Sequence, residues 1–136
     1  MILLDSSVLI DVIEAKPVWG EISARLLHES AQRHRLAINI VVLAEVCRSF
    51  ADVDGFNAFL TDTAIDFIDI PREAGFLAAQ AHHQYRQRGG QRGSTLPDFF
   101  IGAHASVARC PLLTRDPQRI RTYFPDVSLI CPDNTP

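Results

Sequence analysis

The chain contains few cysteines and no recognisable pattern of cysteine or histidine spacing. Its cysteines are odd in number and form no C-x-x-C pair, which argues against a disulfide framework and favours small buried thiols: Cys47, Cys110 and Cys131. The histidines follow no H-E-x-x-H or Cys/His zinc spacing, so we expect them on the surface or on helix faces: His28, His34, His82, His83 and His104. The sequence therefore excludes a zinc site of ordinary spacing and a disulfide scaffold.

Long apolar runs and a basic leader are also missing. No apolar run is long enough to cross a bilayer, and the amino-terminal segment MILLDSSVLI meets an aspartate at its fifth residue. We therefore expect a cytoplasmic protein that does not associate with a membrane. Apolar residues make up 47% and charged residues 21% of 136 residues, which predicts one globular domain over residues 1–136 with a single core.

Positive charge is scarce overall but locally concentrated. The formal net charge is −3 and the only lysine is Lys16, whereas nucleic-acid enzymes usually have a basic surface. Arginines nevertheless cluster in the glycine-rich segment QYRQRGGQRG and around Asp116: Arg86, Arg88 and Arg92, then Arg115, Arg119 and Arg121. Local clusters can bind phosphate whatever the net charge, so the acidic balance does not exclude a nucleic-acid substrate.

The hydrophobic patterning alternates between short strands and helices. Strands are expected over residues 2–4, from residue 36 into LAINIVV, and over residues 65–70, 111–114 and 127–131. Helices are expected after Ser6, over residues 19–35, from about residue 40, and over residues 56–60, 71–87, 97–108 and from 117. This alternation predicts an α/β fold, a three-layer α/β/α sandwich around a mostly parallel central sheet.

Four acidic residues stand in separate, otherwise apolar stretches: Asp5 in MILLDSSVLID, Glu45 in IVVLAEVC, Asp98 in LPDFFIGAHA and Asp116 in PLLTRDP. Two of them, Asp5 and Asp116, end predicted strands, and parallel α/β sheets bind ligands at the carboxyl ends of their strands. Carboxylates that meet in one pocket cannot all stay ionised unless cations fill it. The pattern therefore favours a metal-binding pocket assembled from the whole chain.

Each acid also has an ordinary structural interpretation. Asp5 can cap a helix, Glu45 can lie on a solvated helix face, and Asp98 can complement a helix dipole. Asp116 precedes a proline, which is a strong local capping pattern. Ser7 can donate a hydroxyl to a carboxylate or to a metal-bound water, or it can be a plain helix-start serine.

The chemistry that such a set supports is metal-dependent phosphodiester hydrolysis. Mg²⁺ and Mn²⁺ prefer hard oxygen ligands, which carboxylates and water supply. One ion, or two ions about 4 Å apart, can activate a water and stabilise the leaving oxygen of a phosphodiester.

The four acidic stretches resemble the motifs of PIN-domain ribonucleases, and within that group those of the VapC toxins of bacterial and archaeal toxin–antitoxin pairs. LLDSSVLIDV resembles the opening strand and helix of the family, VVLAEV the second motif, LPDFFIGAHA the third and LLTRDPQRI the fourth. The resemblance covers the full chain. Two residues after the first acid many members carry Asn or Thr, and this chain has Ser7.

The resemblance implies a parallel-sheet sandwich and a Mg²⁺- or Mn²⁺-dependent endoribonuclease. It also implies a homodimer and neutralisation by a small VapB-like antitoxin. Asp5 and Asp98 would be the principal metal ligands. Glu45 and Asp116, the latter at the least constant position of the family, would bind through water or complete a second site. Contacts to substrate or antitoxin are expected from four arginines: Arg86, Arg88, Arg92 and Arg115.

Two other classes of function remain open from the sequence. An aspartate-based phosphotransfer domain is also α/β with acids at strand ends, but Ser7 occupies the position of the second acid of a D-x-D signature. A receiver domain would further need a suitably placed lysine, and Lys16 is the only one. A non-catalytic PIN-like RNA-binding module is the other alternative, although such modules usually lose one or more of the acids.

Overall fold

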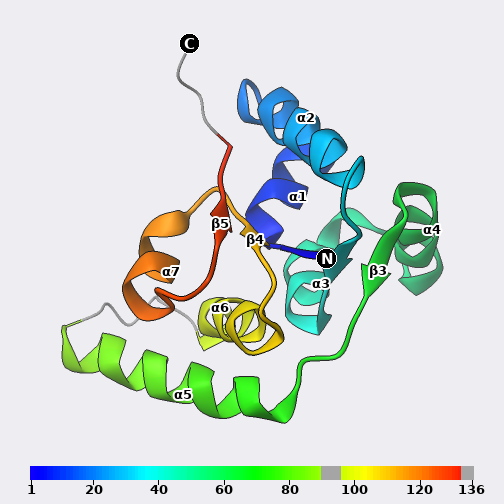
Figure 1. Ribbon diagram of the computed structural model, residues 1–136. Helices are drawn as coiled ribbons and strands as arrows, with labels where there is room; N and C mark the ends of the chain where they lie inside the picture. The colour runs from blue at the N-terminus through cyan, green and yellow to red at the C-terminus, as the bar shows by residue number, and fades with distance from the viewer. Residues whose placement is uncertain (90–95, 133–136) are drawn as a thin grey trace.

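A computed structural model describes residues 1–89 and 96–132, and its centre is a parallel sheet of five strands (Figure 1). The strands are short and lie in the order β3-β2-β1-β4-β5, and every neighbouring pair is parallel. Their bounds are β1 Ile2–Leu4, β2 Leu36–Ile38, β3 Ile65–Phe67, β4 Leu112–Leu113 and β5 Leu129–Ile130.

Helices lie on both sides of the sheet and complete the predicted α/β/α sandwich. They are α1 Ser6–Ile13, α2 Trp19–Ala31, α3 Ile40–Val46, α4 Val53–Thr63, α5 Arg72–Gln87, α6 Leu96–Ala108 and α7 Pro117–Tyr123, with a short 3₁₀ turn η1 at Cys47–Ser49. Figure 1 shows α1 and α2 above the sheet and α5 and α6 below it. None of the described helices is long and apolar enough to span a bilayer.

The strand order places a switch point between β1 and β4. The chain moves from β1 outward to β2 and β3, then returns through α5 and α6 to place β4 on the other side of β1. Asp5 follows β1 and Thr114 follows β4, so both lie at the carboxyl edge where the connections diverge. Such an edge leaves a crevice that other segments do not fill.

The core consists of the three central strands and the helices that cover them. Leu3, Leu4, Leu112 and Leu113 are fully buried. Strands buried on both faces become continuously apolar, which explains why the three central strands contain only Leu, Ile and Ala. The backbone N–H of Asp5 donates to the Leu113 carbonyl at 2.9 Å, so the first acid is fixed in register with β4.

Several predicted boundaries shift for local reasons. The helix over residues 19–35 ends at Ala31, and the strand over residues 65–70 ends at Phe67. The short helix expected over residues 56–60 extends over Val53–Thr63, because the Asp52 carboxylate caps it by accepting from the Gly55 N–H at 2.9 Å. Strand β2 ends at Ile38, because Asn39 accepts from the N–H groups of Val41 and Val42 and begins α3.

Two side chains are of particular interest for their burial. His104 lies on a helix face, which was one of the two expected positions, but the face is the buried one of α6: the residue is 2% exposed, and its Nδ1 lies 3.0 Å from the Asn39 Nδ2. Since the Asn39 oxygen caps α3, the amide donates to the imidazole, and burial lowers the pKa of His104, which keeps it neutral. Cys47 is exposed rather than buried, whereas Cys110 is buried as expected.

Close packing of α6 against α7 requires a glycine. A Cβ built on Gly102 would lie 2.5 Å from the Phe124 ring and 3.0 Å from the Ile120 Cδ1. Phe124 is almost fully buried at the end of α7. The missing side chain therefore lets α7 approach α6, which carries Asp98.

Candidate active site

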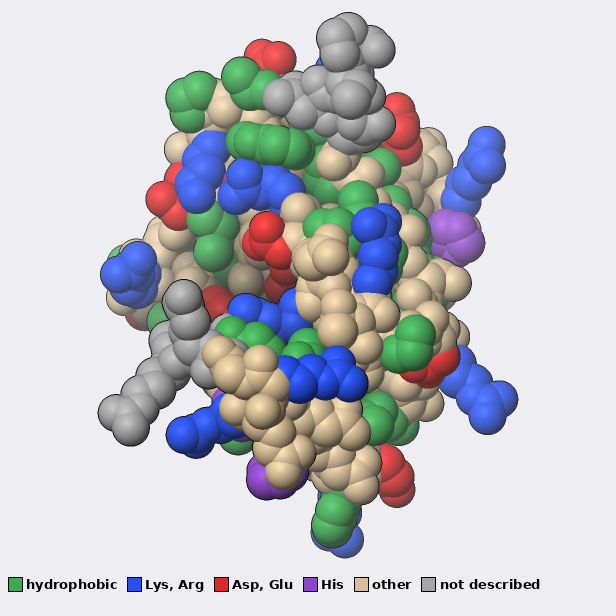
Figure 2. All heavy atoms as spheres, turned by 90° about the vertical axis from the view of Figure 1, so that its left-hand side faces the viewer, with side chains coloured by type: hydrophobic (Ala, Val, Ile, Leu, Met, Phe, Trp, Pro, Cys, Tyr) green, Lys and Arg blue, Asp and Glu red, His purple; other side chains and the backbone are tan. Residues whose placement is uncertain are grey.

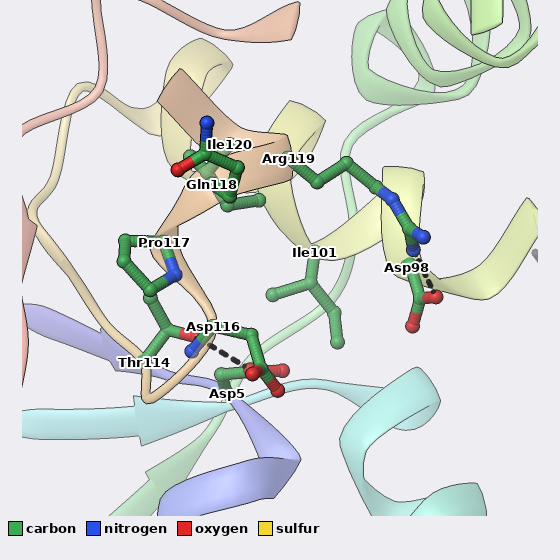
Figure 3. Close-up of a pocket in the computed structure, with 9 residues that line it drawn as sticks. All are labelled: Asp5, Asp98, Ile101, Thr114, Asp116, Pro117, Gln118, Arg119 and Ile120. Carbon is green, nitrogen blue, oxygen red and sulfur yellow. Dashed lines mark hydrogen bonds and ion pairs between the residues drawn. The ribbon is translucent and has the colours of Figure 1, made fainter. Parts of the chain in front are cut away.

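A cavity of about 400 Å³ opens at the carboxyl edge of the sheet, between β1, β4, α6 and α7 (Figure 3). Its lining is polar on the side of the strands and mixed on the side of the helices: Asp5, Asp98, Ile101, Thr114, Asp116, Pro117, Gln118, Arg119 and Ile120. Three of the four acids from the sequence are therefore brought to one cavity. Figure 2 shows acidic side chains at a hollow with basic side chains around them.

Asp5 is the most firmly held of the acids. Its Oδ1 accepts from the Ser6 N–H at 2.9 Å, and its Oδ2 accepts from the Ser7 hydroxyl at 2.8 Å and the Thr114 hydroxyl at 2.7 Å. Burial raises the pKa of Asp5, the three hydrogen bonds lower it, and the charge of Asp98 raises it further. The carboxylate is fixed in orientation but its ionised form is costly, so a nearby cation would stabilise it.

Glu45 does not line the cavity but is coupled to it. Its Oε1 accepts from the Ser6 hydroxyl at 3.1 Å, next to Asp5. Burial raises the pKa of Glu45, and the charges of Asp5 and Asp98 add to the rise. Electrostatic interaction thus connects the acid of α3 with those of β1 and α6.

Asp98 lies in the first turn of α6 and forms an ion pair within the cavity. Its Oδ2 accepts from Arg119 Nη1 at 2.6 Å, and the two side chains are partly exposed, 33% for Arg119 and 40% for Asp98. The Arg119 guanidinium lies 5.2 Å from the Tyr85 ring centroid and 5.6 Å from that of Phe99. An arginine that lies near two aromatic rings therefore also faces one of the acids. Figure 3 shows the Arg119 and Asp98 side chains pointing toward each other.

Asp116 precedes α7 in the position of a capping residue, yet its side chain forms no capping hydrogen bond. Its backbone N–H instead donates to the Thr114 hydroxyl at 3.0 Å. The capping interpretation suggested by the following proline therefore does not account for the carboxylate, which is exposed at the cavity.

Two hydroxyl residues of the site were not identified from the sequence. Thr114 bridges Asp5 and the backbone of Asp116, and Ser6 connects Glu45 to the first turn of α1. The available signal was position: Thr114 directly follows a strand that ends at the same edge as β1. Ser7, which the sequence did suggest, also accepts from the Arg115 N–H at 3.1 Å.

The expected arginine contacts lie in different environments. Arg86 and Arg88 are exposed near the end of α5, and the Arg88 guanidinium lies 5.5 Å from the Tyr123 ring centroid. Arg115 instead packs inward: its guanidinium lies 5.0 Å from the Trp19 ring centroid, and its Nε lies 3.1 Å from Asp11 Oδ2 without hydrogen-bond geometry. Residues 90–93 of the glycine-rich segment, Arg92 among them, fall outside the described residues.

The carboxylate oxygens of the cavity are suitable ligands for a hard divalent cation, although the carboxylates do not converge on one point in this structure. Within residues 1–89 and 96–132, no three His, Cys, Asp or Glu side chains are arranged to hold one metal ion. The carboxylates of Asp5, Asp98 and Asp116 nevertheless face one cavity, and mutual repulsion contributes to the raised pKa values of Asp5 and Glu45. Oxygen ligands with excess negative charge are what Mg²⁺ and Mn²⁺ prefer.

The fold and this edge define a class: a parallel α/β domain with a carboxylate-lined cavity at its switch point. The profile of the PIN-domain family matches residues 2–125, and the chain belongs to that family. No curated protein sequence matches the chain.

Solved structures with the same fold are toxins in toxin–antitoxin complexes. VapBC2 from Rickettsia felis, bound to a DNA fragment from its promoter, superposes with a TM-score of 0.72 at 21% identity, covering 98% of this chain and 100% of the other. A toxin–antitoxin complex from Klebsiella pneumoniae gives 0.70 at 19% identity, covering 99% and 100%. FitAcB from Neisseria gonorrhoeae gives 0.69 at 18% identity, covering 97% and 98%. These superpositions establish a shared fold.

Proposed function

We propose that this PIN-domain protein is a Mg²⁺- or Mn²⁺-dependent endoribonuclease that acts as the toxin of a toxin–antitoxin pair. The main support for this proposal is that three acids from distant parts of the chain line one cavity at the switch point of the sheet: Asp5, Asp98 and Asp116. Glu45 is coupled electrostatically to two of them. Membership of a family of which nucleases are typical supports the same assignment.

The chain's own residues would divide the work between metal binding and orientation. Asp5 and Asp98 would hold the principal ion, and Glu45 and Asp116 would bind through water or complete a second site. Bound there, a divalent cation supplies Lewis-acid polarisation of the phosphodiester and lowers the pKa of a water. Ser7 and Thr114, both hydrogen-bonded to Asp5 Oδ2, would fix the direction of that carboxylate so that its other lone pairs face the cavity.

Partners follow from the surface and from the relatives. Arg86, Arg88, Arg92 and Arg115 would contact RNA phosphates or a small VapB-like antitoxin, as the toxin–antitoxin complexes among the solved relatives suggest. Among Arg86, Arg88 and Arg115, Arg115 is the least accessible to a partner, because its side chain pairs with the buried Asp11. With RNA as substrate, the protein would act in the cytoplasm as a single domain.

A homodimer would cover apolar side chains that are now exposed. Phe76 of α5 is 77% exposed and Ile40 of α3 is 55% exposed. Ile40 and Gly75, the residue before Phe76 in α5, line a groove of about 350 Å³. The lining is almost wholly apolar: Ile40, Val41, Ile70, Pro71, Arg72, Gly75 and Phe100. A second copy would bury this surface by the hydrophobic effect.

Cleavage of single-stranded RNA with Mn²⁺, Mg²⁺ or a chelator tests the assignment. The wild-type chain should cleave only with metal, and Asp5→Asn or Asp98→Asn should reduce the rate by about 100-fold or more. Asp66→Asn is the matched control, because Asp66 lies on the edge strand β3, pairs there with Arg35 and is not part of the cavity.

Induced expression in cells tests the toxin role separately. Growth should stop with the wild-type chain and continue with Asp5→Asn. Full RNA cleavage by Asp5→Asn would contradict the mechanism, whereas metal-independent RNA binding without cleavage would favour the non-catalytic module.

A further inference from the structure

The ion pair between Arg119 and Asp98 puts a permanent positive charge inside the acidic cavity. The Nη1–Oδ2 distance is 2.6 Å, and both residues line the cavity with Asp5 and Asp116. An arginine guanidinium cannot lose its charge near neutral pH. Without a metal ion, Arg119 therefore offsets part of the repulsion among the carboxylates.

Aromatic rings rather than the carboxylate alone hold this guanidinium. Phe99 is fully buried and Tyr85 lies 5.5 Å from it, ring centroid to centroid. The Arg119 guanidinium lies over both rings, within the distance at which cation–π attraction acts. The Arg119 side chain can therefore stay at the cavity when the Asp98 carboxylate binds another group.

Backbone packing delivers the side chain to this position. Arg119 is on α7, and α7 approaches α6 closely only because Gly102 has no side chain. Asp98 is one turn before Gly102 on α6. The contact is thus built into the helix pair, and Figure 3 shows Arg119 reaching across from α7 to Asp98.

From these contacts we infer that Arg119 is an exchangeable counter-ion of the cavity. It neutralises Asp98 in the metal-free protein and competes with a divalent cation for that carboxylate. Once Asp98 is a metal ligand, the guanidinium remains at the rim beside the two rings, and the Nη1 group that donated to Asp98 can donate to an RNA phosphate instead. The inference rests on the proposed function, because it assigns Arg119 a role in the same metal and RNA site.

Two effects of opposite sign distinguish this role from a structural one. Arg119→Gln removes a competitor of the cation, so Mn²⁺ should bind about 3- to 10-fold more tightly in a calorimetric titration without RNA. The same variant should bind a 2′-O-methyl RNA oligonucleotide in Mn²⁺ about 10-fold more weakly, with a salt slope reduced by somewhat less than one.

Arg121→Gln is the matched control, because it removes the same charge from an exposed position on the same helix. Its Mn²⁺ and RNA affinities should stay within about twofold of the wild-type values. Arg119→Lys keeps the charge without the planar fork, so its Mn²⁺ affinity should stay near that of the wild type while RNA binding falls. Equal melting temperatures would confirm that the variants are folded.

Unchanged or weaker Mn²⁺ binding by a folded Arg119→Gln protein would overturn the inference and leave Arg119 with a packing role. Tighter Mn²⁺ binding together with unchanged RNA binding would show that Arg119 competes with the cation but does not contact an RNA phosphate, and would overturn that half of the inference. If the wild-type chain itself binds no Mn²⁺, the proposed metal-dependent function fails and this inference falls with it. If the wild-type chain binds Mn²⁺ and cleaves RNA, only the role of Arg119 is in question.

Discussion

At the scale of single residues, the cavity combines close hydrogen bonding with unfavourable charge. Asp5 accepts three hydrogen bonds and still has a raised pKa, because burial outweighs them. The metal-free fold therefore disfavours the ionised form of this carboxylate. Functional sites commonly store free energy in this way, at the expense of stability.

Asp5→Asn should stabilise the metal-free protein while it removes activity. The pKa of Asp5 is about 4 in the unfolded chain and higher in the folded chain. At a pH between these two pKa values, the folded chain binds a proton more tightly than the unfolded chain. Wild-type stability therefore has a contribution that grows as pH falls through this window and is lost above it. At neutral pH the neutral amide should raise the free energy of unfolding by about 1 kcal/mol, or Tm by about 3 °C.

Thermal unfolding of both proteins with a chelator at neutral and at mildly acid pH measures this difference. The advantage of Asp5→Asn should shrink as the pH falls through the window. A variant that is less stable than the wild type at neutral pH would show that the hydrogen bonds to the carboxylate outweigh its burial.

At the scale of elements, an ion pair fastens the loop after β4 to α1. Asp11 is fully buried, accepts from the Ser23 hydroxyl at 3.0 Å and pairs with Arg115. Its Oδ1 has no hydrogen-bond partner among the described residues. Because Arg115 lies between Thr114 and Asp116, this pair holds both cavity residues against the first helix.

Arg115→Met should destabilise the fold by about 2–3 kcal/mol, because it leaves the Asp11 carboxylate buried without a counter-charge. Adding Asp11→Asn should recover much of that loss, since the double variant has no buried charge at this position. Urea unfolding measures both values. Unchanged stability in Arg115→Met together with lost RNA binding would instead make Arg115 a substrate contact.

The contact between α6 and α7 is equally restrictive. Gly102→Ala would bring a methyl group to 2.5 Å from the Phe124 ring, so it should cost about 1–3 kcal/mol and move Arg119 away from Asp98. Gly55→Ala is the control, because its nearest neighbour would be 3.5 Å away, an ordinary contact within α4. Chemical denaturation should separate the two variants, and equal stability would show that α7 moves at little cost.

At the scale of the whole molecule, one apolar surface on α3 and α5 has no partner within the described chain. If it is the homodimer interface, Phe76→Glu should give a monomer, because burying a carboxylate opposite its symmetry mate is unfavourable. Val53→Glu is the control at another exposed apolar position, 69% exposed on α4. Light scattering after gel filtration measures the mass, and a monomeric wild-type chain would contradict the dimer.

The sheet was predictable because its signal is local. Apolar runs such as ILL and PLLT, and caps such as Asn39, occur within a few residues of the elements that they define. Element boundaries were less predictable, since the start of α4 depends on one side-chain cap at Asp52. The burial of His104 was missed because its partner Asn39 lies 65 residues away.

The sequence by itself determined the α/β class, the order of elements and four acids in apolar surroundings, because periodicity and composition act over short segments. Tertiary structure alone decided which groups meet. It brought Thr114 to Asp5 across 109 residues, turned Arg115 inward to Asp11, and set Arg119 against Asp98. Such contacts depend on strand order and helix packing, which a local pattern does not encode, and they decide how the carboxylates are held and which charges oppose them.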